Sequence, residues 1–137
     1  MATPVHGKNT FVSVNGDDIS GFTNSAELTL GTDAHDRTAF GDDDKRKFPG
    51  LNESSFSCEG WYDSTASGGT RDVFTTVRDG NAAVTVIHRP EGTGSTLPQN
   101  SFSAVLTSYV ESNAVDDIVM WSAEFEVDGA VNQTAQA

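Results

Sequence analysis

The residues that most often do chemistry in proteins are few in this sequence and far apart. The histidines are His6, His35 and His88, and the single cysteine is Cys58. No two histidines have the spacing of a metal-binding pair, and a lone cysteine cannot complete a cysteine-rich zinc site. One cysteine also excludes an internal disulfide framework. We therefore expect structural or solvent-facing histidines and no bound metal.

Carboxylates are abundant, and the densest run is Asp42-Asp43-Asp44. An EF-hand-type calcium loop needs alternating oxygen ligands, a central glycine and a terminal glutamate, all of which this run lacks. The adjacent Lys45-Arg46-Lys47 would also compete for the carboxylates. The pattern favours a solvated charge run and leaves a cation site as the open alternative.

The glycine- and serine-containing motifs do not indicate catalysis either. The segment 92–96, Gly-Thr-Gly-Ser-Thr, lacks the Gly-Lys-Ser/Thr ending of a phosphate loop, and Pro98 and a predicted strand follow it instead of a helix. No serine occupies a Gly-x-Ser-x-Gly elbow. We therefore predict a protein that is not an enzyme, with no catalytic residues and no cofactor.

The net charge of −12 is the strongest compositional signal. A protein that grips phosphates needs Lys or Arg to displace counterions, so direct nucleic-acid binding is disfavoured. The acidity fits solubility or adaptation to high salt, or else a surface that repels DNA. No apolar stretch approaches a membrane span of roughly 18 residues. The first residues lack the features of a signal peptide, so synthesis in the cytoplasm is expected.

Most of the chain between the ends has the period of two that is typical of strands with one buried face. Segments 26–30, 55–62 and 119–127 alternate in this way, while 83–88 and 101–110 are rich in β-branched residues. Asn15-Gly16, between residues 11–14 and 17–19, predicts a type I′ hairpin. In the clearest strand the apolar set alternates with a polar set; the apolar residues are Val119, Trp121, Ala123, Phe125 and Val127.

One short helix is predicted at about residues 70–79, with Ser67 or Thr70 as its cap and Gly80 at its end. Val73, Phe74 and Val77 form its apolar stripe. A helix of this length is unstable alone, so it must lie against the sheet. Residues 31–50 show no convincing period and predict a long charged loop, whose Phe40 and Phe48 suggest docking on a partner. The polar ends, residues 1–9 and 129–137, predict flexible arms on a single domain.

Three motifs in order resemble the major tail tube proteins of long-tailed phages. They are Thr38-Ala39-Phe40-Gly41-Asp42, then Phe48-Pro49-Gly50-Leu51, then the segment 56–63, Phe-Ser-Cys-Glu-Gly-Trp-Tyr-Asp, which leads into the helix. The resemblance covers roughly residues 11–128. It implies an all-β fold, a β-sandwich or partly closed barrel with one flanking helix, and a structural subunit of the virion tail.

The resemblance further implies rings of six subunits that stack into a tube through which the genome passes. Contacts between subunits would come from the long loop and both termini. Partners would be further copies of the chain and tape-measure, terminator and baseplate proteins, with DNA passing unbound. The loop residues implied in these contacts are Asp33, Arg37, Phe40, Asp42, Asp43, Asp44, Lys45, Arg46, Lys47 and Phe48.

An acidic lumen would let a polyanion slide without sticking. We therefore predict that Glu27, Glu59, Glu124 and Glu126, which alternate with core residues, face that lumen. The alternative is that they face solvent on a monomer. A rival function is a small carbohydrate-binding or adhesin-like module, for which Trp61 and Tyr109 are the candidate aromatic platform. A contractile-tail tube, a tail terminator or a secretion-system tube protein would look much alike.

Overall fold

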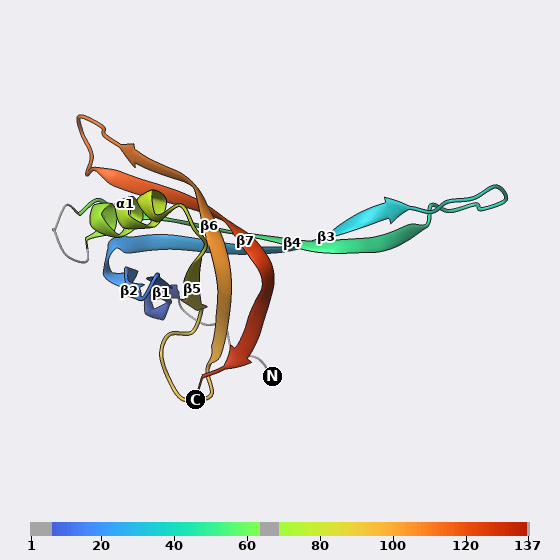
Figure 1. Cartoon of the computed structure of the whole chain (residues 1–137), viewed down its shortest axis with the longest axis horizontal. Coiled ribbons are helices and arrows are strands. Elements are labelled where there is room, and N and C mark those ends of the chain that lie inside the picture. The colour runs from blue at the N-terminus through green and yellow to red at the C-terminus, as the bar shows by residue number, and fades with distance from the viewer. Residues whose placement is uncertain (1–6, 64–68, 137) are drawn as a thin grey trace.

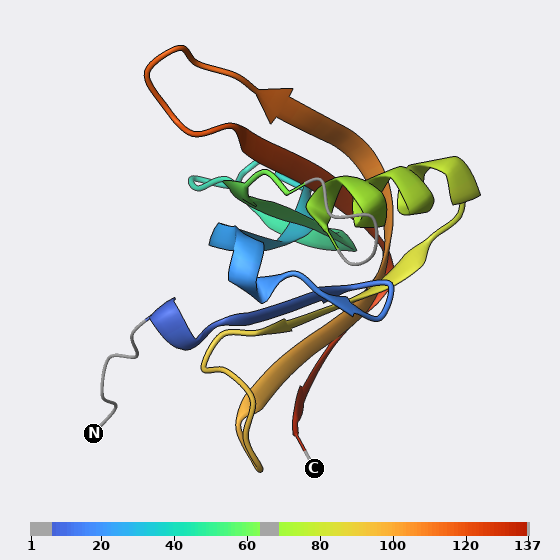
Figure 2. The same ribbon diagram turned by 90° about the vertical axis from the view of Figure 1, so that its left-hand side faces the viewer.

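The computed structural model describes residues 7–63 and 69–136. They form one antiparallel seven-stranded sheet in the order β2-β1-β5-β6-β7-β4-β3, with a single α-helix (Figure 1). The sheet curls without closing (Figure 2), which confirms the predicted all-β fold with one flanking helix. The elements are η1 (Gly7–Asn9), β1 (Phe11–Val14), β2 (Asp17–Asp18), η2 (Ser20–Phe22), β3 (Thr23–Asp36), β4 (Lys47–Trp61), α1 (Thr70–Gly80), β5 (Val84–Arg89), β6 (Pro98–Ser112) and β7 (Met120–Ala135).

The first hairpin forms as its turn residues predict. Asn15 and Gly16 have φ angles of 52° and 85°, so both adopt the left-handed conformation that a type I′ turn requires. Strand β1 then pairs with β5 on its other side, which joins the N-terminal hairpin to the sheet.

Helix α1 confirms the predicted position but not the predicted cap. Val73, Phe74 and Val77 are buried, as their spacing indicates. Thr70 lies inside the helix, and the N-cap is Gly69, which makes no side-chain capping bond. The buried Thr70 hydroxyl instead accepts a hydrogen bond from the Asp63 N–H at 3.2 Å. Ser67 lies outside the described residues, and Asn81, at φ 49°, ends the helix after Gly80.

The predicted loop at residues 31–50 is wrong in its extent. Strand β3 continues to Asp36 and β4 begins at Lys47, so only residues 37–46 connect them. The same correction applies to the predicted tail, because β7 runs to Ala135 and pairs with the first residues of β6. Residues 31–36 are exposed on both faces. A strand without a buried face carries no apolar alternation, so its sequence cannot be distinguished from a loop by period.

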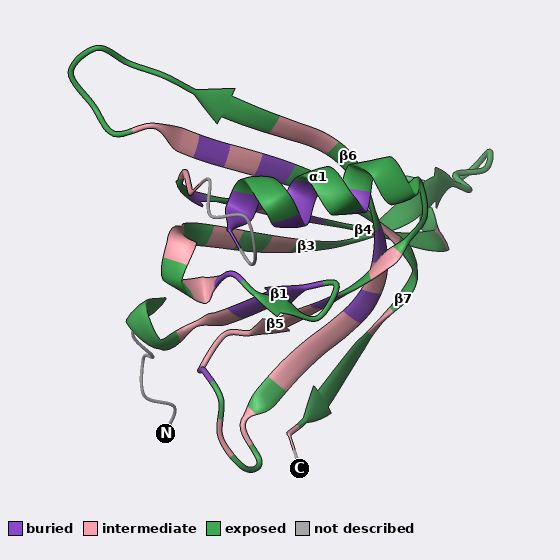
Figure 3. Ribbon diagram, turned by 60° about the vertical axis from the view of Figure 1, so that its left-hand side comes forward, coloured by how far each residue is buried: buried purple, intermediate pink, exposed green. Residues whose placement is uncertain are grey.

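The core lies between α1 and one face of the sheet. The Phe74 ring packs 5.0 Å from both Trp121 and Tyr109 and 6.0 Å from Phe125, measured between centroids. Trp121 donates its indole N–H to the Phe22 carbonyl at 3.2 Å, which fixes η2 against the start of β7. Figure 3 shows the buried residues gathered under α1 and the distal part of the β3–β4 hairpin exposed.

Gly60 is the tightest point of this packing. A Cβ added there would collide with the Phe22 carbonyl oxygen and carbon, which are rigid backbone atoms. We expect Gly60→Ala to lower the free energy of unfolding by about 1–3 kcal/mol, the usual cost of overpacking a core. Urea denaturation followed by circular dichroism measures the change.

Gly80→Ala is the matched control. No atom lies within 4 Å of a Cβ there, and the residue is helical. Replacing glycine in a helix should raise stability by up to about 1 kcal/mol. Equal destabilisation by both substitutions would contradict the assigned packing of Gly60.

Candidate functional site: a carboxylate face, two free edges and an arm

The strand register places the four predicted glutamates on one face of the sheet. Glu27 on β3 lies opposite Ser57 on β4, and Ser57 lies opposite Glu124 on β7. Residues directly opposite in an antiparallel pair project from the same face, so the row shares one side. Glu59 and Glu126 lie in the neighbouring rows, opposite Ser122 and Ser55 respectively. All four glutamates are exposed.

Hydroxyls fill the positions between these carboxylates. We call the set the carboxylate face: Ser25, Glu27, Thr29, Ser55, Ser57, Glu59, Ser122, Glu124 and Glu126. Residues 23–31, 53–61 and 120–128, which supply it, contain no Lys or Arg. The face is therefore polar and negative, without an internal counter-charge.

The opposite face of the same strands is the protein core. Ala26, Cys58 and Ala123 form one row, and Leu28, Phe56 and Phe125 form the next. Helix α1 covers this side. Burial also raises the pKa of the Cys58 thiol to about 12, so this lone cysteine stays protonated and unreactive in the folded chain. Only the carboxylate face is left without a covering layer among the described residues.

Two long sheet edges are unpaired in the described chain. Strand β3 is the last strand of the sheet and pairs only with β4. Strand β5 pairs with β6 no further than Ala104, so residues 105–112 of β6 have a partner on the β7 side alone. Sequence reasoning missed the β6 edge, because pairing partners cannot be read from the alternation within one strand.

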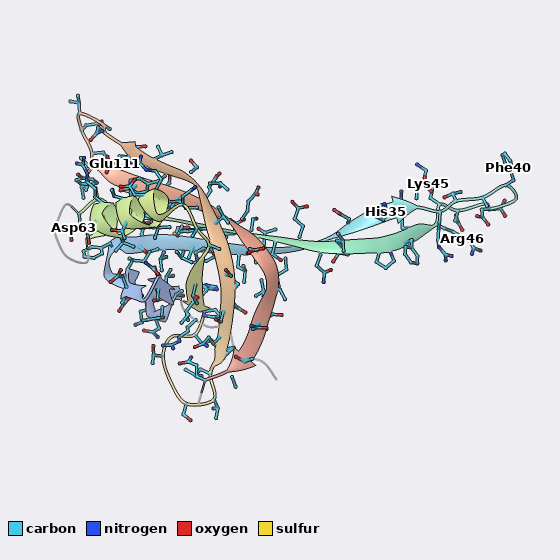
Figure 4. The ribbon with its side chains drawn as sticks, viewed as in Figure 1. His35, Phe40, Lys45, Arg46, Asp63 and Glu111 are labelled. Carbon is cyan, nitrogen blue, oxygen red and sulfur yellow. The ribbon has the colours of Figure 1, made fainter. Side chains whose placement is uncertain are left out.

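The β3–β4 hairpin projects beyond the sheet as an arm. From Ser55, the last β4 residue paired with β7, to Lys47 it extends roughly 25 Å at about 3.3 Å per residue. The connecting turn is ordered: Asp42 accepts a hydrogen bond from the Ala39 N–H at 2.8 Å and lies 3.4 Å from the Arg46 guanidinium. Phe40 is fully exposed at the end of the arm, with Lys45 and Arg46 nearby (Figure 4).

The predicted loop residues therefore lie together on this arm. They occupy its strands or its turn, and almost all are exposed: Asp33, Arg37, Phe40, Asp42, Asp43, Asp44, Lys45, Arg46, Lys47 and Phe48. Phe48 is 59% exposed, and Leu51 near the base of the arm is 82% exposed. Apolar side chains this exposed on a projecting element indicate a surface that another molecule covers.

The remaining candidate groups do not come together. His35 is exposed on the arm, His88 is half-buried beside Phe56, and His6 lies outside the described residues. Burial lowers the pKa of His88, so the ring is neutral at physiological pH. Within residues 7–63 and 69–136, no three His, Cys, Asp or Glu side chains are placed to hold a metal ion, and no helix is long and apolar enough to cross a membrane.

The two candidate platform aromatics lie on opposite faces of the sheet. Tyr109 lies opposite Ala123 on the core side, where it stacks on Phe74. Trp61 lies opposite Met120, in phase with Glu59 on the carboxylate face. They cannot form one platform for a sugar ring, which removes the feature on which the carbohydrate-binding alternative depended.

No family model and no curated protein sequence matches the chain. Solved structures do match its fold over nearly its whole length. A chain of the virion of a native gene transfer agent particle has a TM-score of 0.76 at 11% identity, covering 98% of this chain and 100% of that one. The SPP1 tail tube matches with a TM-score of 0.76 at 11% identity, covering 97% and 80%. A chain of the sheath-tube complex of an extracellular contractile injection system, PVC, matches with a TM-score of 0.72 at 18% identity, covering 97% and 93%.

These likenesses show that the chain has the fold found in phage tail tubes and related injection systems. The predicted resemblance is confirmed at the level of fold. The arm, the unpaired edges and the carboxylate face are described from this chain itself and not from the similar structures.

Repulsion within the carboxylate face should be measurable. Glu124 lies about 7 Å from Glu126 along β7 and about 10 Å from Glu27 across Ser57, and the segments that supply the face contain no Lys or Arg. We expect Glu27→Gln/Glu124→Gln to raise the melting temperature of the dispersed protein by about 1–3 °C at low salt. In 1 M salt, where the Debye length is about 3 Å, the gain should disappear.

Asp17→Asn, on the short exposed strand β2, is the control for removing a charge elsewhere. It should leave the melting temperature unchanged at both salt concentrations. A gain for the double variant that persists in 1 M salt would mean that packing, and not charge repulsion, caused it.

Proposed function

We propose that this protein is a structural, non-enzymatic subunit of a virion tail tube, which assembles into stacked, six-fold rings around the path of the genome. The observation that carries the proposal is the four-stranded unit β6-β7-β4-β3. Among the described residues, it has a free edge along β3, a second along residues 105–112 of β6, and one uncovered face. The likeness in fold to the SPP1 tail tube, and to the tail of an empty gene transfer agent particle of C6 symmetry, supports it.

The direction of the strands permits ring closure. Successive strands in β6-β7-β4-β3 are antiparallel, so β3 and β6 run in opposite directions. Strand β3 of one subunit can therefore pair antiparallel with residues 105–112 of β6 in its neighbour. Such a head-to-tail contact repeats identically and closes into a ring when the rotation allows. Pairing would also satisfy two edges that otherwise favour uncontrolled aggregation.

The carboxylate face then turns toward the lumen. Helix α1 packs on the other side of the four-stranded unit. Strands β1 and β5, at the far end of the curled sheet, contribute to the same core. The bulk of each subunit would therefore lie outside the wall of the ring. Glu27, Glu59, Glu124 and Glu126 would line the channel among serine and threonine hydroxyls. A negative lumen without Lys or Arg repels phosphates and lets DNA pass without binding.

The other contacts of the tail follow from the same proposal. The arm and the two chain ends would make contacts between subunits and rings. Tape-measure protein inside the tube, and terminator and baseplate proteins at its ends, would be the further partners, with the assembled protein located in the virion after synthesis in the host cytoplasm. The likeness in fold to a chain of the anti-feeding prophage baseplate structure is compatible with such neighbours.

Electron microscopy of the concentrated purified protein tests the proposal directly. We expect hollow tubes or six-fold rings, and a reconstruction should place the carboxylate face on the inner wall. A protein that stays monomeric at high concentration would contradict the assembly. Tubes with these glutamates on the outer wall would contradict the lumen assignment alone.

Hydrogen exchange tests which edges close the ring. Amides in residues 24–32 of β3 and 105–112 of β6 should exchange more slowly in assembled tubes than in dispersed protein, because pairing protects edge N–H groups. Residues 55–60 of β4, paired on both sides already, are the internal control and should change little. Protection of β2 in place of β3 and β6 would assign ring closure to the other edge of the sheet.

A further inference from the structure

The two ends of the long strands carry complementary surfaces. The arm leaves the sheet where β3 ends and β4 begins, beyond the Ser55↔Glu126 pair. The turn between β6 and β7, residues 113–119, leaves the opposite end, because Trp61 lies opposite Met120 there. Figure 4 shows the same separation: Phe40, Lys45 and Arg46 lie at one extremity of the molecule, and Asp63 and Glu111 at the other.

The arm end concentrates the positive charge of an otherwise acidic chain. Half of the eight Lys and Arg residues lie in residues 37–47: Arg37, Lys45, Arg46 and Lys47. Three carboxylates share the segment, and the side chain of Asp42 is already engaged by Arg46 and the Ala39 N–H. With Asp36, which lies opposite Lys47, the arm end has four cations and four carboxylates, so it lacks the acidity of the rest of the chain. It exposes Lys45 and Lys47 beside one fully exposed aromatic ring, Phe40.

The β6–β7 turn is its counterpart in charge and in apolar character. Asp116 and Asp117 are exposed, and residues 113–119 contain no Lys or Arg. Val115 is fully exposed and Ile118 is 59% exposed, so the turn offers aliphatic surface between carboxylates. The turn is shaped locally, because the Asp117 carboxylate accepts a hydrogen bond from the Ile118 N–H at 2.7 Å. Arg71, on α1, donates a hydrogen bond to the Tyr62 hydroxyl at 2.9 Å.

We propose that the β6–β7 turn is the acceptor for the arm of a second copy of this chain, in the adjacent ring. The inference rests on the proposed tube and identifies which surface its arm binds. Lys45 and Lys47 of one subunit would lie against Asp116 and Asp117 of the next, with Phe40 packed on Val115 and Ile118. Because the two surfaces occupy opposite ends of the same strands, the contact is head-to-tail and repeats along the tube without limit.

Charge reversal on each side tests the contact. The tip-reversed variant carries Lys45→Glu and Lys47→Glu and keeps Arg46, which holds Asp42. The turn-reversed variant carries Asn113→Lys, Asp116→Lys and Asp117→Asn, since asparagine retains the oxygen that accepts the Ile118 N–H. Each variant alone opposes like charges, so tube mass in electron microscopy and sedimentation should fall at least about tenfold while rings persist.

Mixing the two variants should restore the tubes. In the mixture, each acidic arm meets a basic turn and each basic arm meets an acidic turn, so rings of the two kinds would alternate. A single chain carrying all five substitutions should also form tubes. The reversals Arg78→Glu and Asp17→Lys, at exposed positions on α1 and β2, are the matched controls and should assemble like the unmodified chain.

An arm-shortened variant gives an independent result. Asp36 lies opposite Lys47, so replacing residues 37–46 with Asn-Gly closes the hairpin by a type I′ turn and keeps the register. We expect rings without tubes.

The outcomes separate this inference from the proposed function. Tubes from both charge-reversed variants alone, or no recovery on mixing, would overturn the acceptor assignment and leave the tube proposal standing. An unmodified chain that forms rings but never tubes would overturn the stacking contact. An unmodified chain that forms neither would overturn both. Circular dichroism of each variant checks that the strand core is folded.

Discussion

The backbone hydrogen-bonding capacity of two unpaired strand edges is the constraint on which the rest of this structure depends. Strand β3 and the distal half of β6 present N–H and C=O groups that no other described strand satisfies. In a free chain water must solvate these groups, and any extended segment can pair with them. Because β3 and β6 run in opposite directions, the β3 edge of one copy can pair antiparallel with the β6 edge of another. In the proposed assembly, the edges that would otherwise favour aggregation would form the main contact between subunits.

The two faces of the same four strands, β6-β7-β4-β3, have opposite chemistry. One face carries Phe56, Phe125 and Trp121 and is sealed by α1, which gives the subunit its stability. No described element covers the other face, where Trp61, Val105 and Val110 lie at the margins. Between them, serine, threonine and glutamate on β3, β4 and β7 keep that face hydrated. Solubility of the free subunit and, in the proposed tube, passage of a polyanion would therefore both require polar or acidic side chains at these positions.

The parts of the fold that sequence could predict are those with one dry face. The alternation at residues 119–127 and 55–62, the Asn15-Gly16 turn and the stripe of α1 each reflect burial against a core, and the structure confirms them. Burial also implies that alternating glutamates share a face, as the register shows. The arm has no buried face, and the end of β7 has one half-buried apolar residue, Val131, so neither carries the apolar alternation of a strand and their sequence looks like a loop. The cap of α1 differs from the prediction, because Thr70 lies inside the helix and its hydroxyl accepts the hydrogen bond of the Asp63 N–H.

The Lys and Arg residues are unevenly distributed, and this distribution would reduce the repulsion that the net charge causes between copies of the chain. Subunits of formal charge −12 repel one another, and in the proposed tube this repulsion would act wherever rings meet face to face. A uniformly acidic surface would leave stacking to apolar contact alone. Half of the cations lie at the end of the projecting arm, about 25 Å from the carboxylate-rich sheet. This distance exceeds the Debye length of roughly 8 Å at physiological salt, so the cations on the arm are screened from the carboxylates of the sheet. In the proposed stacking contact, only a surface that the arm touches would feel the attraction of these cations, so charge would determine the register between rings more than the overall affinity. The exposed apolar residues at both ends, Phe40 on the arm and Val115 on the turn, would supply the part of the contact that salt does not screen.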